Sequence, residues 1–377
     1  MRKVMVVIIN RANYARIKSA LHAIRKHKDL DLKIAVGASM LLPRFGEAIN
    51  VIKKDGFEID EEIRITLEGE NPITMAKSTG IGLLELSTLF ENHKPDIVMT
   101  IADRYETLAT AIAASYMNIP LAHTQGGEIS GSIDNSVRDA ITKLAHIHFV
   151  TNKTCAKRVK NMGEDAKRIF ITGCPSIDIA EEVSKNPDKY IKKHSKDISL
   201  TIDTNKPFLL VMQHPVTTEY KEAAFHIRET MKALVELEMP SFVLYPNVDA
   251  GSYLMVKEMQ HMGVENLPYL SFYKNLSPEF FLALLAKASC IVGNSSAGIR
   301  ESSFFGTPSV TIGSRQHRRE RSSNVVEVKH NSSAIQDAIR YQLKHGRYKR
   351  SALYGDGKAG QRIADHLAKI DLDIIKK

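Results

Sequence analysis

Short apolar runs alternate with amphipathic, helix-like segments along almost the whole chain, and no other feature limits its possible folds as strongly. In the first half the apolar runs cover residues 4–9, 32–36, 96–101, 119–123, 148–150 and 169–171. Helix-like segments such as residues 14–25, 105–116, 136–145 and 153–162 separate them. Because parallel strands are joined by helical crossovers, this alternation predicts an α/β fold with parallel sheets covered by helices.

A polar, lysine-rich stretch at residues 181–206 interrupts the alternation and is typical of a connection between domains. Strand-like runs then resume at residues 208–212, 242–245, 267–270, 290–292 and 309–312. A chain of 377 residues is also longer than one hydrophobic core usually serves. The sequence therefore predicts two Rossmann-like domains facing each other across a cleft, with residues 1–180 in the first and 181–354 in the second.

Several classes of protein are not expected from the composition. No apolar run approaches the roughly 20 residues of a membrane-spanning helix, and residues 1–10 indicate a first buried strand rather than a secretion signal. Cys155, Cys174 and Cys290 are far apart and fit no metal-binding spacing, which favours buried thiols in a reducing cytoplasm. We therefore expect a cytoplasmic protein without a metal or a membrane contact.

The net charge of +9 comes from basic residues scattered over many segments. The cluster at residues 192–196 indicates a solvated surface or linker, and there is no zinc-finger spacing, basic helix with aromatics, or RNP-like motif. We therefore expect no nucleic-acid partner, and a small phosphorylated ligand would explain a local positive site equally well. The glycine fingerprint of dinucleotide sites does not follow the first strand, so no cofactor is expected.

The segment IVGNSSAGIRE at residues 291–301 places small hydroxyl side chains between a strand and a helix expected to start near Ala297. Ser295, Ser296 and the helix N-terminus indicate an anion site, although a single serine that caps the helix would explain less of the pattern. Glu301 follows about one turn later. Its carboxylate could accept hydrogen bonds from ribose hydroxyls, or could only balance the helix dipole.

The next strand is followed by Arg315, at the same edge of the predicted sheet. Because a guanidinium binds phosphate through two parallel hydrogen bonds, Arg315 is a candidate phosphate ligand. For Arg318, Arg319 and Arg321 the sequence favours ordinary surface charge.

Two further loops of the second half carry polar groups directly after strands. His214 lies in QHPVT, where Pro215 keeps it extended at the strand exit. Asn247 and Ser252 follow in YPNVDAGS, where they either meet a nucleotide or build a turn and a helix cap.

The first half has three loops of the same kind. Arg11 follows the first strand, Asp103 and Arg104 follow a later one, and HTQGGEISGSID occupies residues 123–134. Ligands of open α/β sheets bind at the carboxyl ends of strands. We therefore expect four groups to converge on one rim, opposite the phosphate donors: Asp103, His123, Glu128 and Asp134.

Several long motifs in a consistent order carry a family resemblance over nearly the whole chain. They are ADRYETLA at 102–109, IPLAHTQGGEISGSID at 119–134, AITKLAHIHF at 140–149, GCPSIDIA at 173–180, HPVT at 214–217, YPN at 245–247, GNSSAGIRES at 293–302 and GTPSVTIGSRQ at 306–316. With these motifs the chain resembles the UDP-N-acetylglucosamine 2-epimerases, especially the hydrolysing branch that serves sialic and other nonulosonic acid synthesis. The GGE loop and AITKLAH favour that branch over the non-hydrolysing one.

The resemblance implies a glycosyltransferase-B-like pair of Rossmann domains, with a C-terminal helix (about residues 355–377) returning to the first. It also implies a homo-oligomer, a dimer or tetramer, with UDP mainly on the second domain. By residue match, the UDP and sugar contacts are Arg11, Arg104, His214, Asn247, Ser295, Ser296, Glu301 and Arg315. Catalytic or sugar-contacting roles are implied for Asp103, His123, Asp134 and His214.

The implied reaction has two steps and uses no cofactor. UDP leaves C1 of the sugar as the C2 proton is removed, which gives a 2-acetamidoglucal. Water then adds across the double bond and gives free N-acetylmannosamine plus UDP. Arginines and hydroxyls would stabilise the leaving diphosphate, and a carboxylate or histidine would accept the proton.

The chain departs from the family pattern at several positions. The sialic-acid branch commonly has a glutamate where this chain has Gln125, and an amide cannot act as a base. Either Glu128 or Asp134 then carries that role, or the sugar differs. Other departures are Asn13, Ala102 and Asp139.

We therefore expect a hydrolysing UDP-N-acetylglucosamine 2-epimerase first. The near alternative is UDP-N,N'-diacetylbacillosamine as substrate, with Gln125 helping to bind that sugar. Further alternatives are a non-hydrolysing epimerase and, because of Gln125 and Asn13, a non-catalytic protein that binds nucleotide-sugars.

Overall fold

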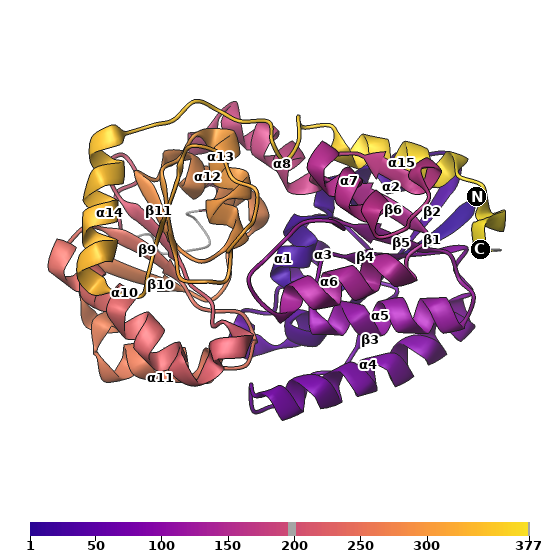
Figure 1. Ribbon diagram of the computed structural model, residues 1–377, viewed down its shortest axis with the longest axis horizontal. Coiled ribbons are helices and arrows are strands. Elements are labelled where there is room, and N and C mark those ends of the chain that lie inside the picture. Colours follow the sequence, from indigo (N-terminus) through magenta and orange to yellow (C-terminus); the bar gives the residue numbers. More distant parts are fainter. Residues whose placement is uncertain (195–200, 376–377) are drawn as a thin grey trace.

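The computed structural model describes residues 1–194 and 201–375, and it contains two parallel sheets with helices on both faces (Figure 1). The first sheet has the order β3-β2-β1-β4-β5-β6-β7. Its strands are β1 (Arg2–Ile8), β2 (Leu30–Gly37), β3 (Glu61–Ile63), β4 (Ile97–Ile101), β5 (Leu121–Thr124), β6 (Ile147–Val150) and β7 (Ile169–Ile171). The second sheet has the order β10-β9-β8-β11-β12-β13. Its strands are β8 (Leu209–Met212), β9 (Ser241–Leu244), β10 (Leu270–Tyr273), β11 (Cys290–Gly293), β12 (Ser309–Ile312) and β13 (Val325–Val328). The predicted α/β architecture with two Rossmann-like units is confirmed.

Most expected strands are found within a few residues of their expected positions. Their apolar runs are continuous because a central parallel strand is covered on both faces: in β1, Val4 pairs with Leu32 on one side and Ile97 on the other. The expected strand at 267–270 begins three residues later, at Leu270, because residues 264–266 form a 3-10 turn. Short edge strands β3 and β13 were not predicted, since their mixed burial leaves no continuous apolar run.

The helices of the first half are α1 (Arg11–Ala15), α2 (Lys18–Lys26), α3 (Ile49–Lys54), α4 (Pro72–His93), α5 (Tyr105–Tyr116), α6 (Ile133–Leu144) and α7 (Lys153–Asn161). Those of the second half are α10 (Ala223–Leu237), α11 (Ser252–His261), α12 (Pro278–Lys287), α13 (Arg300–Phe305) and α14 (Ser332–His345). The connection expected at 181–206 is partly helical: α8 (Pro175–Ser184) and α9 (Pro187–His194) occupy its start. Residues 195–200 of that connection, with part of the lysine cluster, lie outside the described residues.

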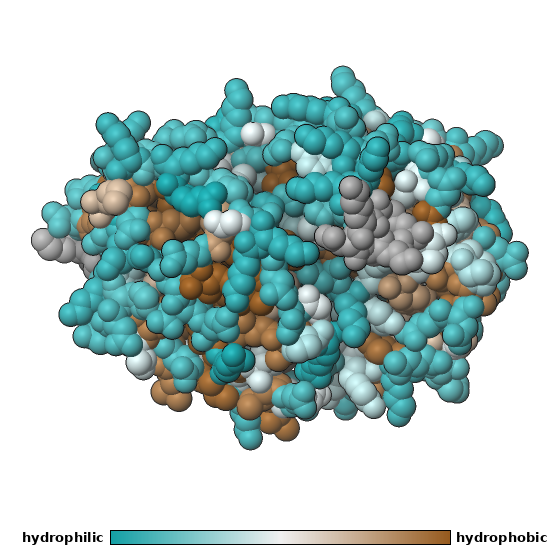
Figure 2. Space-filling view, turned by 180° about the vertical axis from the view of Figure 1, so that it is seen from behind, coloured by the Kyte–Doolittle hydropathy of each residue, from teal (hydrophilic) through white to brown (hydrophobic). Residues whose placement is uncertain are grey.

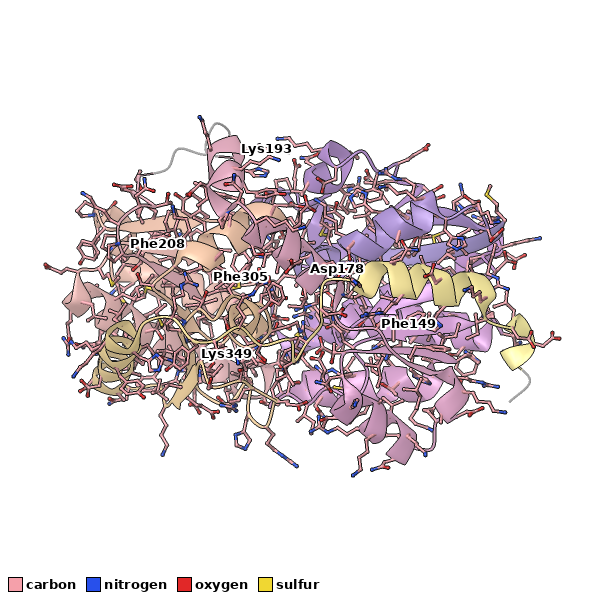
Figure 3. All side chains as sticks on the ribbon, turned by 90° about the horizontal axis from the view of Figure 1, so that it is seen from above. Phe149, Asp178, Lys193, Phe208, Phe305 and Lys349 are labelled. Atoms are coloured by element: carbon pink, nitrogen blue, oxygen red, sulfur yellow. The ribbon has the colours of Figure 1, made fainter. Side chains whose placement is uncertain are left out.

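The helix α15 (Ala359–Lys369) lies beside α2 on the first sheet, as Figure 1 shows. Its buried residues Ile363 and Leu367 share a core with Leu21 and Ile24 of α2. A Cβ on Gly360 would approach the Ser19 backbone to 2.6 Å, so only glycine allows this close packing. Asp178, labelled in Figure 3 at the start of α15, accepts from the backbone N–H of residue 359 at 2.9 Å and caps the helix.

The apolar side of α8 packs with the second half of the chain. Ile177 and Val183 belong to the same core as Phe208 and Phe280. We therefore propose that the chain crosses between domains after β7, and that residues 1–173 with α15 form the first domain. The rest of the described chain forms the second.

The three cysteines are free and buried, as expected. Among the described residues, no helix has both the length and the apolar content to cross a membrane. On the face shown in Figure 2 hydrophilic side chains predominate, and hydrophobic ones appear in patches between them.

Candidate active site

One pocket lies where the two sheets face each other, with an empty volume of about 1090 Å³ that includes its open mouth. The loops that follow β1, β4, β8 and β11 all contribute to its lining. In both sheets these strands stand at the point where the strand order reverses. Such switch points are where open α/β sheets bind ligands, because the adjacent loops leave in opposite directions.

The loop after β11 supplies the serines expected at the phosphate site. Ser295 and Ser296 both line the pocket, and the hydroxyl of Ser296 accepts a hydrogen bond from Arg16 at 2.6 Å. Ser295 caps a 3-10 turn (Ser296–Gly298), and the following α13 begins only at Arg300. The helix expected to start near Ala297 is therefore not formed there, and side-chain donors rather than a long helix dipole characterise this loop.

Among the described residues, five arginines line the pocket: Arg11, Arg16, Arg104, Arg315 and Arg319. Three carboxylates line it as well: Asp103, Asp134 and Glu301. Burial lowers the pKa of Arg11 and of Arg16 to about 10, which still leaves both guanidiniums charged near neutrality. The balance of charge is positive and suits an anion such as a diphosphate.

Two of these arginines were not predicted. Arg16 was hidden inside a helix-like run, and its role depends on the contact with Ser296 from the other sheet. Arg319 was expected on the surface, but it is 5% exposed. It donates to the backbone carbonyl of Ile129 at 3.2 Å, so the first domain covers it; Arg318 is exposed as expected.

Arg11 and Arg104 line the pocket, but both hold the two domains together in this structure. Arg11 donates to Asn247 at 3.1 Å and to the Tyr245 carbonyl at 2.7 Å. Arg104 contacts the carboxylates of Glu106 and Asp249. Because these contacts occupy their guanidinium groups, we infer that Arg11 and Arg104 hold the two domains together rather than bind an anion.

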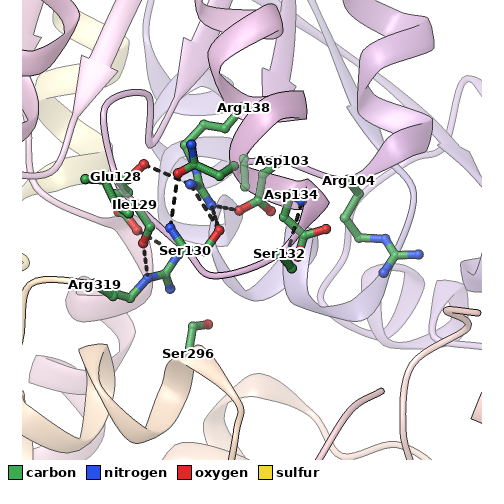
Figure 4. Close-up of polar contacts among 12 residues, drawn as sticks. Asp103, Arg104, Glu128, Ile129, Ser130, Ser132, Asp134, Arg138, Ser296 and Arg319 are labelled. Carbon is green, nitrogen blue, oxygen red and sulfur yellow. Dashed lines mark hydrogen bonds and ion pairs between the residues drawn. The ribbon is translucent and has the colours of Figure 1, made fainter. Parts of the chain in front are cut away.

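Of the four groups expected on one rim, Asp103 and Asp134 line the pocket. Asp103 follows Ala102, which has a positive φ of 64°, and its carboxylate is paired with buried Arg138 (Figure 4). Asp134 lies 3.6 Å from Arg315. Burial raises the pKa of Asp134 although Arg315 opposes the shift, so this carboxyl can exchange a proton closer to neutrality than an exposed aspartate.

The other two groups are placed elsewhere, which corrects the expected rim. His123 is fully buried beneath the loop, and its Nε2 lies 2.7 Å from the carbonyl oxygen of Ala102. Burial lowers the pKa of His123 to about 4, so the ring is neutral and fixes the backbone next to Asp103. Glu128, 3% exposed, lies between Arg300 at 2.6 Å and Arg319 at 3.3 Å.

The carboxylate of Glu128 joins the two domains. Burial alone would raise its pKa, but Arg300 and Arg319 outweigh that effect and hold the pKa below its usual value. A carboxylate that is held by two arginines and does not line the pocket is poorly placed to accept a proton from a substrate. The sequence left open whether Glu128 or Asp134 accepts the substrate proton. The position of Asp134 in the pocket lining favours Asp134.

Gln125 is also turned away from the pocket lining. Its side-chain nitrogen lies 3.5 Å from the Cys174 sulfur, and its backbone has a positive φ of 66°. The structure therefore gives no support to the idea that Gln125 touches the sugar.

Ser252 does not line the pocket either, because its hydroxyl stabilises a turn. It contacts the Asn247 carbonyl and accepts a hydrogen bond from the Asp249 N–H at 3.0 Å.

His214 lines the pocket as expected, and its Nδ1 accepts from the backbone N–H of Asn247 at 3.2 Å. Burial and the nearby Arg315 keep its pKa well below the usual value. The ring is therefore neutral with its proton on Nε2, which makes it a hydrogen-bond donor to an anion rather than a base.

The second domain also contributes an apolar wall that sequence analysis missed: Leu244, Leu276, Pro278, Phe281 and Leu282. In the sequence these residues are indistinguishable from core positions. Glu301 lines the same pocket and accepts a hydrogen bond from Ser176 at 2.5 Å. An apolar wall next to polar acceptors suits a planar base attached to a ribose.

Comparisons with known proteins identify the family of this chain. The family model for UDP-N-acetylglucosamine 2-epimerase matches residues 22–368. The chain is 35% identical to the UDP-N,N'-diacetylbacillosamine 2-epimerase (hydrolyzing) of Legionella pneumophila, over 98% of this chain and 97% of that protein. It is 34% identical to the GDP/UDP-N,N'-diacetylbacillosamine 2-epimerase (hydrolyzing) of Campylobacter jejuni, over 86% and 84%. It is 29% identical to the UDP-N-acetylglucosamine 2-epimerase of Neisseria meningitidis, over 95% and 92%.

Solved structures share the fold. The Neisseria meningitidis UDP-GlcNAc 2-epimerase bound to UDP-GlcNAc superposes with a TM-score of 0.80 at 17% identity, over 98% of this chain and 100% of that one. The Methanocaldococcus jannaschii enzyme in complex with UDP-GlcNAc and UDP gives 0.81 at 18% identity, over 97% and 99%. Since the family model spans most of the chain and two relatives exceed 30% identity over 98% and 86% of it, this chain belongs to the UDP-N-acetylglucosamine 2-epimerase family.

Proposed function

We propose that this chain is a hydrolysing 2-epimerase that acts on a UDP-linked 2-acetamido sugar. The observation that carries the proposal is the pocket itself. Arg315, Arg319 and Ser296 of the second domain face the carboxylates of Asp103 and Asp134 across the gap between the domains, and Arg16 lines the pocket from the same side as the carboxylates. A reaction that expels a diphosphate and moves a proton needs both sets of groups.

UDP-N,N'-diacetylbacillosamine is our first candidate substrate, and UDP-N-acetylglucosamine is the second. The motifs alone put them in the opposite order. Two relatives support the reversal: their names specify diacetylbacillosamine, and they are 35% and 34% identical to this chain. The relative named for N-acetylglucosamine is 29% identical.

In the first step the diphosphate would lie against Arg16, Arg315 and Arg319. Their positive charge stabilises the negative charge that grows on UDP as the C1–O bond breaks. The Nε2–H of His214 adds a neutral donor. The electron pair of the broken bond leaves with UDP, so positive charge at C1 acidifies the C2–H bond.

Asp134 is our candidate for the group that removes the C2 proton. The electron pair of the C2–H bond then forms the C1=C2 double bond of the 2-acetamidoglucal, and Asp134 holds the proton. Its raised pKa and its place in the pocket lining support this role.

The second step adds water across the double bond, with hydroxide at C1 and a proton at C2. Because the product has the opposite configuration at C2, that proton must arrive from the other face of the ring. A second proton carrier is therefore required, and Asp103, held by Arg138 in the pocket lining, is our candidate. Its carboxylate takes a proton from the attacking water and delivers it to C2, and the proton that Asp134 removed returns to solvent. The products are UDP and a free 2-epimerised sugar.

The proposal also includes the use of the product, the location of the protein in the cell and its oligomeric state. A free 2-epimer is a suitable precursor for sialic or other nonulosonic acids. We further propose a cytoplasmic location, which the three free thiols support, and a homo-oligomer, dimer or tetramer, which light scattering during gel filtration would measure.

The decisive experiment is incubation with each UDP-sugar in heavy water, followed by NMR of the products. The proposal expects free UDP and a reducing sugar with deuterium at C2. A UDP-linked epimer without free UDP would establish the non-hydrolysing alternative. UDP binding without turnover of either sugar would establish a binding protein instead.

A further inference from the structure

A second group of ligand-type side chains lies in the second domain, outside the residues that line the pocket. Glu219 belongs to a 3-10 segment (Thr217–Glu222), His226 to α10, and His330 follows β13. Each offers one ligand atom, and these atoms lie within 4.8 Å of one another. Nothing in the proposed reaction uses these three residues.

The two imidazole rings are stacked, with centroids 3.6 Å apart and planes 8° from parallel. Both ring nitrogens of His330 are buried and have no hydrogen-bond partner among the described residues. Buried polar atoms are normally paired, because leaving them unpaired costs free energy. An unpaired imidazole beside a second imidazole and a carboxylate is therefore typical of a site that binds an ion.

Gly313 lies directly against the imidazole ring of His330. A Cβ on Gly313 would lie 2.2 Å from the Nε2 of His330, and Gly313 has a positive φ of 73°. Glycine therefore serves both the backbone conformation and the room around the ring. Within the described chain no hydrogen bond fixes the ring of His330, which is positioned by its stacking on His226 and its contact with Gly313.

The surroundings favour a cation. Glu219 lies 3.9 Å and Glu222 lies 3.4 Å from the Nε2 of His226, and the charge of Glu229 also acts on His330. Imidazole nitrogens and a carboxylate oxygen therefore lie together here, and both kinds of atom are ligands of zinc-class ions.

We infer that Glu219, His226 and His330 form a binding site for a divalent transition-metal ion of the zinc class. Two imidazoles and one carboxylate are a nitrogen-rich donor set, which magnesium and calcium avoid. Zinc–nitrogen bonds are about 2.0–2.1 Å long, so the ligand atoms must move together from their present separation. This movement would have to include a turn of the His330 ring out of its stacking on His226.

The ion would act on the pocket indirectly. Ser314 donates a hydrogen bond to Glu219 at 2.6 Å, and the next residue is Arg315 of the pocket. The carbonyl of Arg315 in turn accepts from the N–H of Gly131 in the first domain at 2.9 Å. A metal that fixes Glu219 therefore holds the Arg315 loop in place without touching the substrate.

Titration of the full-length, tag-free, chelator-treated protein with Co²⁺ tests the inference, with visible absorption and calorimetry as readouts. We expect one high-affinity Co²⁺ per chain, displaced by Zn²⁺. His226→Gln and His330→Gln should each weaken binding by about tenfold or more. Glu219→Gln should weaken it too, and tests the site independently of either ring.

His345→Gln is the matched control. His345 also stacks on an aromatic ring, that of Tyr348 at 3.7 Å, but it is exposed at the end of α14 and is not part of the group of Glu219, His226 and His330. This variant should bind Co²⁺ like the wild type. The inference is wrong if the wild type binds no Co²⁺ at micromolar concentrations, or if binding persists in the folded variants of Glu219 and His330. Binding does not require turnover, so the result is independent of the proposed reaction.

Discussion

Replacing Glu128 by glutamine should destabilise the protein strongly while leaving the proton-transfer chemistry intact. The carboxylate of Glu128 lies between Arg300, which is fully buried, and Arg319, which is 5% exposed. Glutamine keeps the size of the side chain but removes its charge. Two buried guanidiniums would then face an uncharged amide, and one of them is the link between the second domain and residues 128–129 of the first.

The magnitude follows from the burial of the three groups. Removing one partner of a buried ion pair typically costs about 3–5 kcal/mol, because the remaining charge is left uncompensated in a poorly solvated site. The unfolding entropy of globular proteins is about 2.1 cal/mol/K per residue, or about 0.8 kcal/mol/K for a chain of this length. The melting temperature should therefore fall by about 4–6 °C.

The assay is thermal and urea unfolding of the wild type, Glu128→Gln and a control, Glu181→Gln. Glu181 also pairs with an arginine, Arg350 at 2.9 Å, but its side chain is 40% exposed. An exposed pair contributes about 0–1 kcal/mol, so the control should melt near the wild type. Equal melting temperatures for both variants would refute the reasoning. A loss of turnover without loss of stability would show instead that Glu128 is the proton acceptor.

Three further predictions concern the pocket and its support. Asp134→Asn should lower turnover by about 10²–10⁴-fold with unchanged UDP affinity by calorimetry; weaker UDP binding with normal turnover would contradict its role. The pKa of His123 is about 4 in the fold against about 6.5 unfolded, so the unfolded state binds more protons between these values. His123 alone should therefore contribute about 3 kcal/mol to the fall in stability from pH 6.5 to 4, and urea unfolding of His123→Gln should show a shallower fall. Gln125→Ala should leave the kcat/KM ratio of the two UDP-sugars unchanged, because its amide contacts Cys174 outside the pocket lining; a changed ratio would restore its sugar-binding role.

The sequence predicted where the strands end, and it therefore predicted many of the polar residues that line the pocket. A strand covered on both faces needs an unbroken apolar run, and the polar residues that end the run necessarily lie at the sheet edge. Asp103, His214, Ser296 and Arg315 were found in this way, and all four line the pocket. The long shared motifs likewise determined the family.

Tertiary structure alone decided which way the loop side chains face. Arg16 and Arg319 belong to the pocket because Ser296 and the carbonyl of Ile129 reach them from the opposite domain. Glu128 is turned away from the pocket for the same reason, since two arginines of the second domain bind its carboxylate. Such orientations depend on contacts between residues far apart in the chain, and local sequence patterns carry information only about near neighbours.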